Sequence, residues 1–185
     1  MNHKVIYASS YDRGLECLLE MWPEIRKLVP DATLDVYYGW NSFDAVHKQN
    51  PEQMKWKWTM IRKFHELKGE GVSEHGRVDH ETLAEKFAEC KVWAYPTEFN
   101  EINCITALKA QEYGCIPVTT GCYALETTVA DHTYTVACND IYTNTDKQAE
   151  FIKNVVAALT SEHEVKPVAG VSWEEVAEAW HASVL

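Results

Sequence analysis

The chain has 185 residues, of which 46% are hydrophobic and 24% charged, and these values are typical of one soluble globular domain. Its formal net charge of −11 argues against nucleic acid as the main partner, because neutralising a phosphate backbone takes clustered lysine and arginine. The sequence has no apolar run of about 18 residues and no apolar signal-peptide core in its first residues, so it predicts no transmembrane segment and no secretion signal.

The first third of the chain alternates predicted strands with predicted helices. Residues 3–8 are a β-rich run, and residues 14–29 carry large apolar side chains at the three- and four-residue spacing of an amphipathic helix, which Pro30 ends. Residues 33–38 predict a second strand, and residues 51–68 a second helix that begins with proline. This alternation is typical of βαβ units and a parallel sheet.

The middle of the chain continues in the same way. Asp79 and Asn103 are each expected to cap the start of a helix, because their short side chains can accept a hydrogen bond from a free backbone N–H group. The predicted elements are, in order, a strand at 72–75, a helix at 80–89, a strand at 91–95, a helix at 103–113 and a strand at 116–119.

The last third contributes an element at 125–129, a polar strand near 133–137, and helices at 146–160 and 173–183. The whole pattern predicts an α/β fold, a Rossmann-like three-layer sandwich with a doubly wound parallel sheet of about six strands. No internal repeat or linker divides the chain, so residues 1–185 are expected to form one domain. Right-handed crossovers would then place all strand-to-helix loops at one edge of the sheet.

Four loops are expected to meet at that edge, and the first of them, residues 9–14, suits a diphosphate. Ser9 and Ser10 offer hydroxyl groups, Arg13 offers a fixed cation that can bind bidentately, and Gly14 opens a helix whose dipole favours negative charge. The alternative is structural: Ser10 or Asp12 caps the helix, and Arg13 is solvated.

The second and third loops contain glycines that allow a ligand to approach the backbone. Gly39 directly follows the second predicted strand, and Gly76 lies in the turn HGRV, where a flat ring could come close to the chain. Arg77 is then either a contact to a phosphate or base, or a surface charge. Val78 completes this turn.

The fourth loop, residues 97–106, precedes the helix that is predicted at 103–113. The free backbone N–H groups of Cys104, Ile105 and Thr106 would form an anion site, because a helix N-terminus attracts negative charge. Glu101 and Asn103 lie just before them and can hydrogen-bond a sugar or a ribose. Lys109 lies further along the helix, as a ligand contact or as a surface residue whose stem packs on apolar groups.

Competing chemistries have little support in the sequence. GxGxxG, GxxxxGK[ST] and GxSxG motifs are absent. The six cysteines form no CxxC pair, which favours reduced thiols and a cytoplasmic protein over a disulfide framework. The eight histidines show no paired spacing, so no metal site is expected. A Cys104–His nucleophilic pair stays open, although only the presence of both residue types supports it.

Several short motifs, in this order and at this spacing, span nearly the whole chain. The motifs are Asp12-Arg13-Gly14-Leu15, Gly76-Arg77-Val78 before Leu83-Ala84, Pro96-Thr97, Glu101, Lys109-Ala110, Gly114-Cys115-Ile116-Pro117-Val118 and Ser172-Trp173-Glu174-Glu175. The set resembles the C-terminal, nucleotide-sugar-binding domain of a GT-B glycosyltransferase, from the large group of retaining enzymes called family 4.

The resemblance implies a nucleoside-diphosphate sugar as the substrate, with UDP or GDP as the nucleotide, and no metal or other cofactor. It implies that Arg13 neutralises the diphosphate together with the N–H groups of residues 104–106. Glu101 would bind the hydroxyl groups of the donor sugar, and residues 76–78 would hold the base through their backbone. Arg13 and Glu101 are therefore the expected catalytic residues, acting by electrostatic stabilisation of the leaving group.

Two departures from the family pattern bear on function. The second glutamate of the family, which usually holds the ribose, is Lys109 here, and an ammonium group cannot accept hydrogen bonds from ribose hydroxyls. The N-terminal, acceptor-binding domain of such enzymes is also missing, so a second domain or a partner subunit is expected. The alternatives are a non-catalytic module that binds a nucleotide or nucleotide sugar, and a structural or oligomerisation domain.

Overall fold

Five short apolar runs form one parallel sheet in this computed structural model, which describes residues 2–165 and 173–184. The strands lie in the order β3-β2-β1-β4-β5. The chain adds β2 and β3 on one side of β1, and then crosses back to add β4 and β5 on the other side of β1. This reversal puts a topological switch point between β1 and β4. The strands are β1 (Lys4–Tyr7), β2 (Thr33–Tyr37), β3 (Val72–Gly76), β4 (Val92–Tyr95) and β5 (Ile116–Thr119).

One row of aliphatic side chains runs across all five strands and explains their register. In β1, Val5 is aligned with Leu34 of β2 and with Val92 of β4. The row continues outward to Val72 in β3 and to Ile116 in β5, and all five side chains are buried. In β2 and β3, where polar residues adjoin Leu34 and Val72, a shift of one residue would bring a polar side chain into this row, so burial favours this register.

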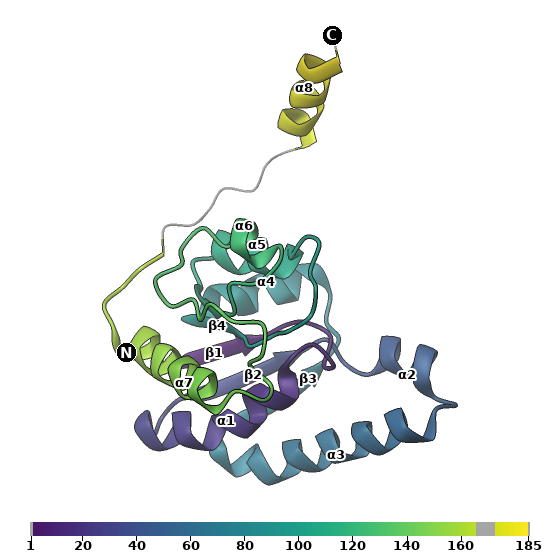
Figure 1. Ribbon diagram of the computed structural model, residues 1–185, viewed down its shortest axis with the longest axis vertical. Helices are drawn as coiled ribbons and strands as arrows, with labels where there is room; N and C mark the ends of the chain where they lie inside the picture. Colours follow the sequence, from purple (N-terminus) through teal and green to yellow (C-terminus); the bar gives the residue numbers. More distant parts are fainter. Residues whose placement is uncertain (1, 166–172, 185) are drawn as a thin grey trace.

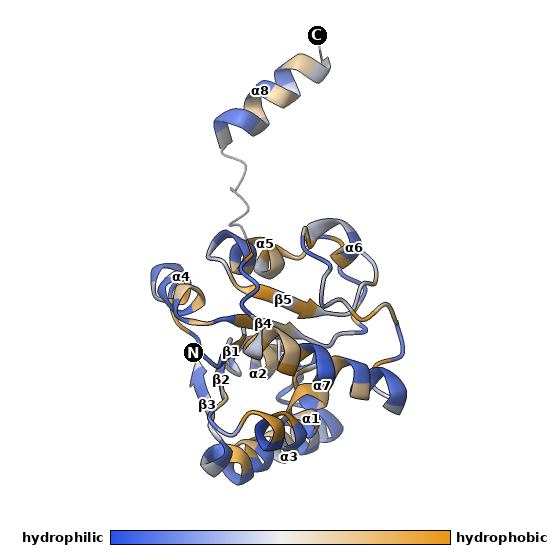
Figure 2. Cartoon of the chain, turned by 90° about the vertical axis from the view of Figure 1, so that its left-hand side faces the viewer, coloured by the Kyte–Doolittle hydropathy of each residue, from blue (hydrophilic) through white to orange (hydrophobic). Residues whose placement is uncertain are grey.

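Helices cover both faces of the sheet and make three layers (Figure 1). One face carries α1 (Leu15–Leu28), α3 (Pro51–Leu67) and α7 (Thr145–Thr160), and the other carries α4 (His80–Glu89), α5 (Ile105–Glu112) and the short α6 (Leu125–Thr128). In Figure 2 the apolar colouring is strong in β4 and β5 and on α1, whereas β3 is largely hydrophilic. The core therefore lies between the sheet and its two helical layers.

The remaining helices lie outside this sandwich. The short α2 (Asn41–His47) follows β2, the 3₁₀ turn η1 (Lys68–Glu70) joins α3 to β3, and α8 (Trp173–Val184) lies apart from the layers (Figure 1). Helix α8 confirms the helix that was predicted at 173–183, whereas Ser172 of the closing motif lies outside the described residues. No helix among the described residues is both long and apolar enough to cross a membrane.

Most predicted elements are confirmed, and two helices begin where the sequence predicts, one of them with the predicted cap. The Asp79 carboxylate accepts a hydrogen bond from the Thr82 N–H at 2.7 Å, which caps α4. Helix α3 begins with Pro51, and the Asn50 side chain accepts hydrogen bonds from the first turn. These local signals are strong enough to place helix starts without help from tertiary contacts.

The prediction of about six strands is wrong, because the described chain forms a sheet of five. The segment near 133–137, expected as a polar strand, contributes only an isolated bridge between Thr120 and Val136. Within it, Val136 is fully buried, while the Thr135 N–H and hydroxyl both bond to His132 in a turn. A single buried side chain fixes the segment beside β5 without extending it into a strand.

Two further expectations near the sheet edge are also wrong. Asn103 does not cap the helix: α5 begins at Ile105, with Cys104 as its N-cap and no side-chain cap bond. The start of α5 is instead tied to β1 by tertiary contact, because the Thr106 hydroxyl donates to the Ala8 carbonyl at 3.2 Å. The second loop, expected at residues 39–43, is shorter than predicted because α2 begins at Asn41, and its N-cap Trp40 makes no side-chain cap bond.

The two sides of the sheet are protected differently. Strand β3 is exposed on one side, and its Ser73, Glu74 and His75 are solvent-accessible. The other side, beside β5, is covered by the chain around Val136, whose backbone exchanges hydrogen bonds with Thr119 and Gly121.

Candidate functional site

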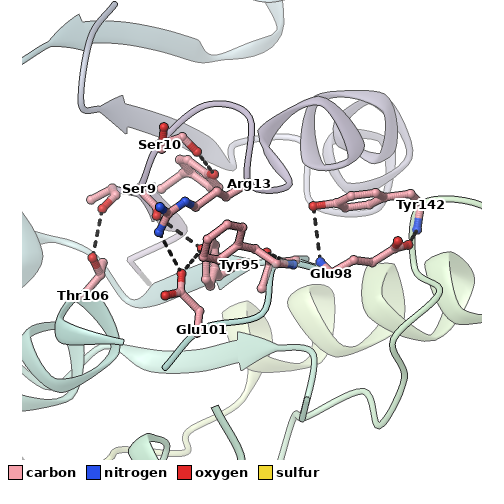
Figure 3. Close-up of polar contacts among 12 residues, drawn as sticks. Ser9, Ser10, Arg13, Tyr95, Glu98, Glu101, Thr106 and Tyr142 are labelled. Carbon is pink, nitrogen blue, oxygen red and sulfur yellow. Dashed lines mark hydrogen bonds and ion pairs between the residues drawn. The ribbon is translucent and has the colours of Figure 1, made fainter. Parts of the chain in front are cut away.

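The centre of the candidate site is an ion pair at the switch point between β1 and β4. Arg13, from the loop after β1, places Nη1 3.4 Å from Oε1 of Glu101, in the loop after β4 (Figure 3). The Glu101 side chain is 8% exposed and that of Arg13 is 35% exposed, so the cation is the partner that faces solvent. The guanidinium carbon also lies 3.7 Å from the centre of the Phe99 ring, which fixes its position.

A buried hydroxyl relay holds Glu101 in place. The Tyr95 hydroxyl, at the end of β4, donates to Glu101 Oε1 at 2.7 Å, and the Ser9 hydroxyl donates to the Tyr95 oxygen at 3.3 Å (Figure 3). Burial raises the pKa of Tyr95 well above its ordinary value, so this side chain stays a hydrogen-bond donor at neutral pH. Glu101 is therefore oriented by neighbours from both loops before any ligand binds.

The loop after β1 packs backbone to backbone against the end of β4. Gly14 has φ +109°, and a Cβ atom on it would lie 2.1 Å from the Pro96 carbonyl oxygen. The Arg13 N–H donates to the Ser10 carbonyl at 3.0 Å, and the Tyr7 hydroxyl donates to the same oxygen at 2.7 Å. Only glycine allows this approach, and the approach is what brings Arg13 next to Glu101.

Beside this ion pair lies a pocket of about 450 Å³, bounded by the ends of β1 and β2, the turn after β3, and α5. Its walls bring together five residues that the sequence predicts as ligand contacts: Arg77, Val78, Ile105, Thr106 and Lys109. The strand-to-helix loops therefore do meet at the carboxyl edge, as the parallel sheet requires.

The second and third loops support each other on one side of this pocket. The Tyr38 N–H donates to the Gly76 carbonyl at 2.9 Å, and a Cβ atom on Gly39 would lie 2.9 Å from the Arg77 nitrogen. Tyr38 itself has φ +142°, a backbone conformation that non-glycine residues rarely adopt. A Cβ atom on Gly76, by contrast, would have nothing within 4 Å, so the backbone of this turn is open toward solvent.

Two cations face the pocket from opposite walls. Lys109 places Nζ 3.2 Å from His80 Nδ1, and both residues line the pocket. Arg77, in the turn after β3, is exposed and has no hydrogen-bond or ion-pair partner among the described residues. The sequence leaves Arg77 open as a ligand contact or a surface charge, and the structure places it at the mouth of the pocket.

Seven of the predicted residues belong neither to the ion pair nor to the pocket walls: Ser9, Ser10, Gly14, Gly39, Gly76, Asn103 and Cys104. Asn103 is exposed, and it neither caps α5 nor lines the pocket. Cys104 is buried, and burial raises the pKa of its thiol to about 11. A thiol with such a pKa is protonated at neutral pH, so the arrangement argues against Cys104 as a nucleophile.

Sequence reasoning missed several residues that shape the site. Tyr95 and Phe99 hold Glu101 and Arg13, and Tyr38 and His80 line the pocket. Tyr142 holds the loop after β4 from a distant segment, because its hydroxyl accepts from the Glu98 N–H at 3.2 Å (Figure 3). Tyr95 had a recognisable signal, since it ends a buried strand directly before the loop that carries Glu101. The contacts of His80 and Tyr142 depend on the tertiary fold.

The α/β fold matches one Rossmann-like half of the GT-B fold seen in solved glycosyltransferase structures. No protein-family model matches the chain, and no curated protein does. Among solved structures, the chain is similar to the pneumococcal O-GlcNAc transferase GtfA in complex with UDP and GlcNAc. That match has a TM-score of 0.69 and 14% identity, and it covers 98% of this chain and 35% of GtfA.

Two further solved structures support the same fold. HepE from Anabaena, in complex with UDP-glucose, has a TM-score of 0.58 and 15% identity, covering 100% of this chain and 49% of HepE. The catalytic domain of the cholesterol-α-glucosyltransferase from Helicobacter pylori has a TM-score of 0.52 and 16% identity, covering 86% of this chain and 98% of that domain. The chain thus spans about a third of GtfA and about half of HepE.

The relay around Tyr95 gives a first testable prediction. A Tyr95→Phe variant keeps the ring but leaves the Glu101 carboxylate without its shortest donor, so Glu101 should lose its fixed orientation. If Glu101 binds the sugar of a nucleotide sugar, affinity for that ligand should fall about tenfold, with affinity for the matching nucleoside diphosphate unchanged. Calorimetric titration of both ligands checks this, and a Tyr134→Phe variant, whose ring packs against His163 and not against the ion pair, is the control. Equal losses for both ligands would contradict an orienting role.

Proposed function

We propose that this chain is the C-terminal, nucleotide-sugar-binding half of a retaining, metal-independent glycosyltransferase. The observation that carries the proposal is the Arg13–Glu101 pair at the switch point, next to the first turn of α5 and beside the 450 Å³ pocket. Ligands of open α/β sheets bind outside the carboxyl ends of the strands at this point. A fixed cation, free helix N–H groups and a buried carboxylate there suit a diphosphate linked to a sugar.

Each part of the site has a role in this proposal. The Arg13 guanidinium and the N–H groups at the start of α5 stabilise the charge that develops on the leaving diphosphate as its bond to the sugar breaks. Glu101, held by Tyr95, accepts hydrogen bonds from hydroxyl groups of the donor sugar. The open backbone at Gly76–Val78 accommodates the base. No step of this scheme needs a metal ion, so activity should be insensitive to a chelator.

Transfer to an acceptor is proposed to need a second domain or a partner subunit. The chain spans about a third of GtfA and about half of HepE, and a GtfA/B complex is among the similar structures, with a TM-score of 0.67 and 14% identity. In this proposal the second half would close over the carboxyl edge and bring the acceptor to the donor. The free cysteines support a reducing compartment, and we infer a cytoplasmic site of action.

A second function, a non-catalytic module that binds a nucleotide, is favoured by one observation. Lys109 lines the pocket where the resemblance implies a glutamate that holds the ribose. Such a module would retain the fold and the anion site and sense or sequester a nucleotide.

Titration with UDP-glucose, GDP-glucose and ADP-glucose, followed by a search for slow hydrolysis of the bound donor, separates these functions. Binding of one nucleotide sugar with hydrolysis supports the transferase, whereas binding without any turnover supports the module. If none of the three sugars or their nucleoside diphosphates binds at millimolar concentration, both functions are wrong. An Arg62→Ala variant, which changes an exposed arginine on α3, is the matched control for surface charge.

A further inference from the structure

The pocket beside the Arg13–Glu101 pair is more positive than its surroundings. The protein has a formal net charge of −11, yet Arg77 and Lys109 both line this pocket. The one carboxylate in the pocket wall, Asp79, already accepts two hydrogen bonds from Thr82 as the cap of α4. The pocket thus has two cations and one carboxylate whose hydrogen-bonding capacity is largely used within its own helix.

The other described arginines all have a hydrogen-bond or ion-pair acceptor, and Arg77 does not. Arg13 has Glu101 as its partner, Arg26 donates to the Ala32 carbonyl, and Arg62 pairs with Glu66. Within the described residues, Arg77 is the arginine that has no acceptor, and it faces the same pocket as Lys109. Among the described residues, neither Arg77 nor Lys109 forms an ion pair, and Lys109 has only the neutral acceptor His80 Nδ1, so an anion bound in the pocket would be attracted by both cations.

Arg13 alone cannot neutralise a diphosphate. The diphosphate of a nucleotide sugar carries more than one negative charge, whereas the Arg13–Glu101 pair has no net charge. Additional positive charge at this edge of the sheet is available from the cations that line the pocket, and Lys109 is the one that lies on α5.

Helix α5 links the loop that carries Arg13 to the pocket that contains Lys109. Thr106 and Lys109 are three residues apart on this helix, so they lie on one face, and both line the pocket. The Thr106 hydroxyl is bonded to the Ala8 carbonyl, at the end of β1 and the start of the loop that carries Arg13. A ligand bound at the first turn of α5 therefore extends along this face toward Lys109.

We propose that Lys109 binds a phosphate of the ligand and supplies the second positive charge of the diphosphate site. The proposal rests on the proposed function, and it gives Lys109 a different role from the ribose-binding glutamate that the resemblance implies. The Lys109 ammonium donates to His80 Nδ1, which leaves its other N–H groups for phosphate oxygens. In this proposal, lysine at position 109 binds an anion, whereas a glutamate at the same position would bind the ribose.

Reversing the charge distinguishes the two roles, because they predict changes of opposite sign. If Lys109 binds phosphate, Lys109→Glu should weaken binding of UDP about tenfold or more and leave binding of uridine unchanged. If position 109 holds the ribose, a glutamate there should leave UDP affinity unchanged or raise it, and that result would overturn the proposal. Lys109→Met tests the loss of charge without reversal and should weaken UDP binding less than Lys109→Glu.

The matched control is Lys55→Glu, the same charge change at an exposed position of α3. Uridine, UMP, UDP and inorganic pyrophosphate are titrated against each variant, with the guanosine and adenosine series in parallel. Failure of the wild-type chain to bind any nucleotide would count against the proposed function. Pyrophosphate binding that is lost in Lys109→Glu would then still support the phosphate contact, and pyrophosphate binding that is unchanged would refute it.

Discussion

Replacing Arg13 with alanine is expected to weaken binding of a nucleoside diphosphate about 100-fold or more. The change removes the cation at the switch point and leaves the Glu101 carboxylate, which is 8% exposed, without its ionic partner. A bare buried carboxylate repels the phosphates that Arg13 attracts, so both effects have the same sign. Titration of the UDP, GDP and ADP series measures the loss, with Arg62→Ala on α3 as the control.

Replacing Glu101, the partner of Arg13, is expected to have the opposite effect on affinity for a nucleoside diphosphate. Glu101→Gln keeps the shape of the side chain and releases Arg13 from its ion pair, so affinity for the nucleoside diphosphate should stay the same or rise. Affinity for the nucleotide sugar, and any hydrolysis of it, should fall, because an amide is a weaker acceptor for sugar hydroxyls. If Arg13→Ala bound UDP, GDP and ADP as well as the wild type does, the anion site at the switch point would be disproved.

Gly14→Ala is expected to destabilise the fold by about 3 kcal/mol or more. The residue has φ +109°, and its new Cβ atom would lie 2.1 Å from the Pro96 carbonyl oxygen and 3.3 Å from the Thr97 Cα. These neighbours are backbone atoms of the segment that follows β4, so relieving the clash requires the loop and this segment to separate. Urea unfolding followed by circular dichroism measures the free energy of unfolding.

Two other glycines serve as graded controls for this measurement. Gly69→Ala should change stability by less than about 0.5 kcal/mol, because its φ is not left-handed and no atom lies within 4 Å of the new Cβ. Gly76→Ala should cost about 1 kcal/mol, since it has the same free space but a φ of +69°. A loss at Gly14 no greater than that at Gly76 would show that the close approach to Pro96 is unimportant for stability.

Much of the fold could be predicted because β1, β4 and β5 are buried along nearly their whole length and so appear as continuous apolar runs. The run at Val92–Tyr95 and the Asp79 and Pro51 helix starts are examples of local signals that tertiary structure did not override. Helix α2 could not be predicted in the same way, because it is short, polar and uncapped by any side chain. The segment around Val136 was predicted wrongly for a different reason: it has β-branched residues, but among the described residues only Val136 pairs with the neighbouring chain, whereas the Thr135 N–H bonds to His132 in a turn.

The candidate site was predictable in outline and not in detail. The parallel sheet brings the ends of β1 and β4 together, so the proximity of Arg13 and Glu101 follows from topology. Their direct pairing does not, since it depends on Gly14 packing on Pro96 and on the ring of Phe99. Likewise, no local pattern connects Lys109 with His80, which belongs to another helix and lies 29 positions earlier in the chain.

The flanks of the sheet bear on how this protein behaves in concentrated solution. An unpaired flank with long, apolar strands would recruit neighbouring molecules through backbone hydrogen bonds and lead to aggregates. Here one flank displays the ionisable Glu74 and His75, and the opposite flank is occupied by the chain around Val136. Charged side chains on one edge and a covering segment on the other disfavour edge-to-edge pairing of two molecules through β-augmentation.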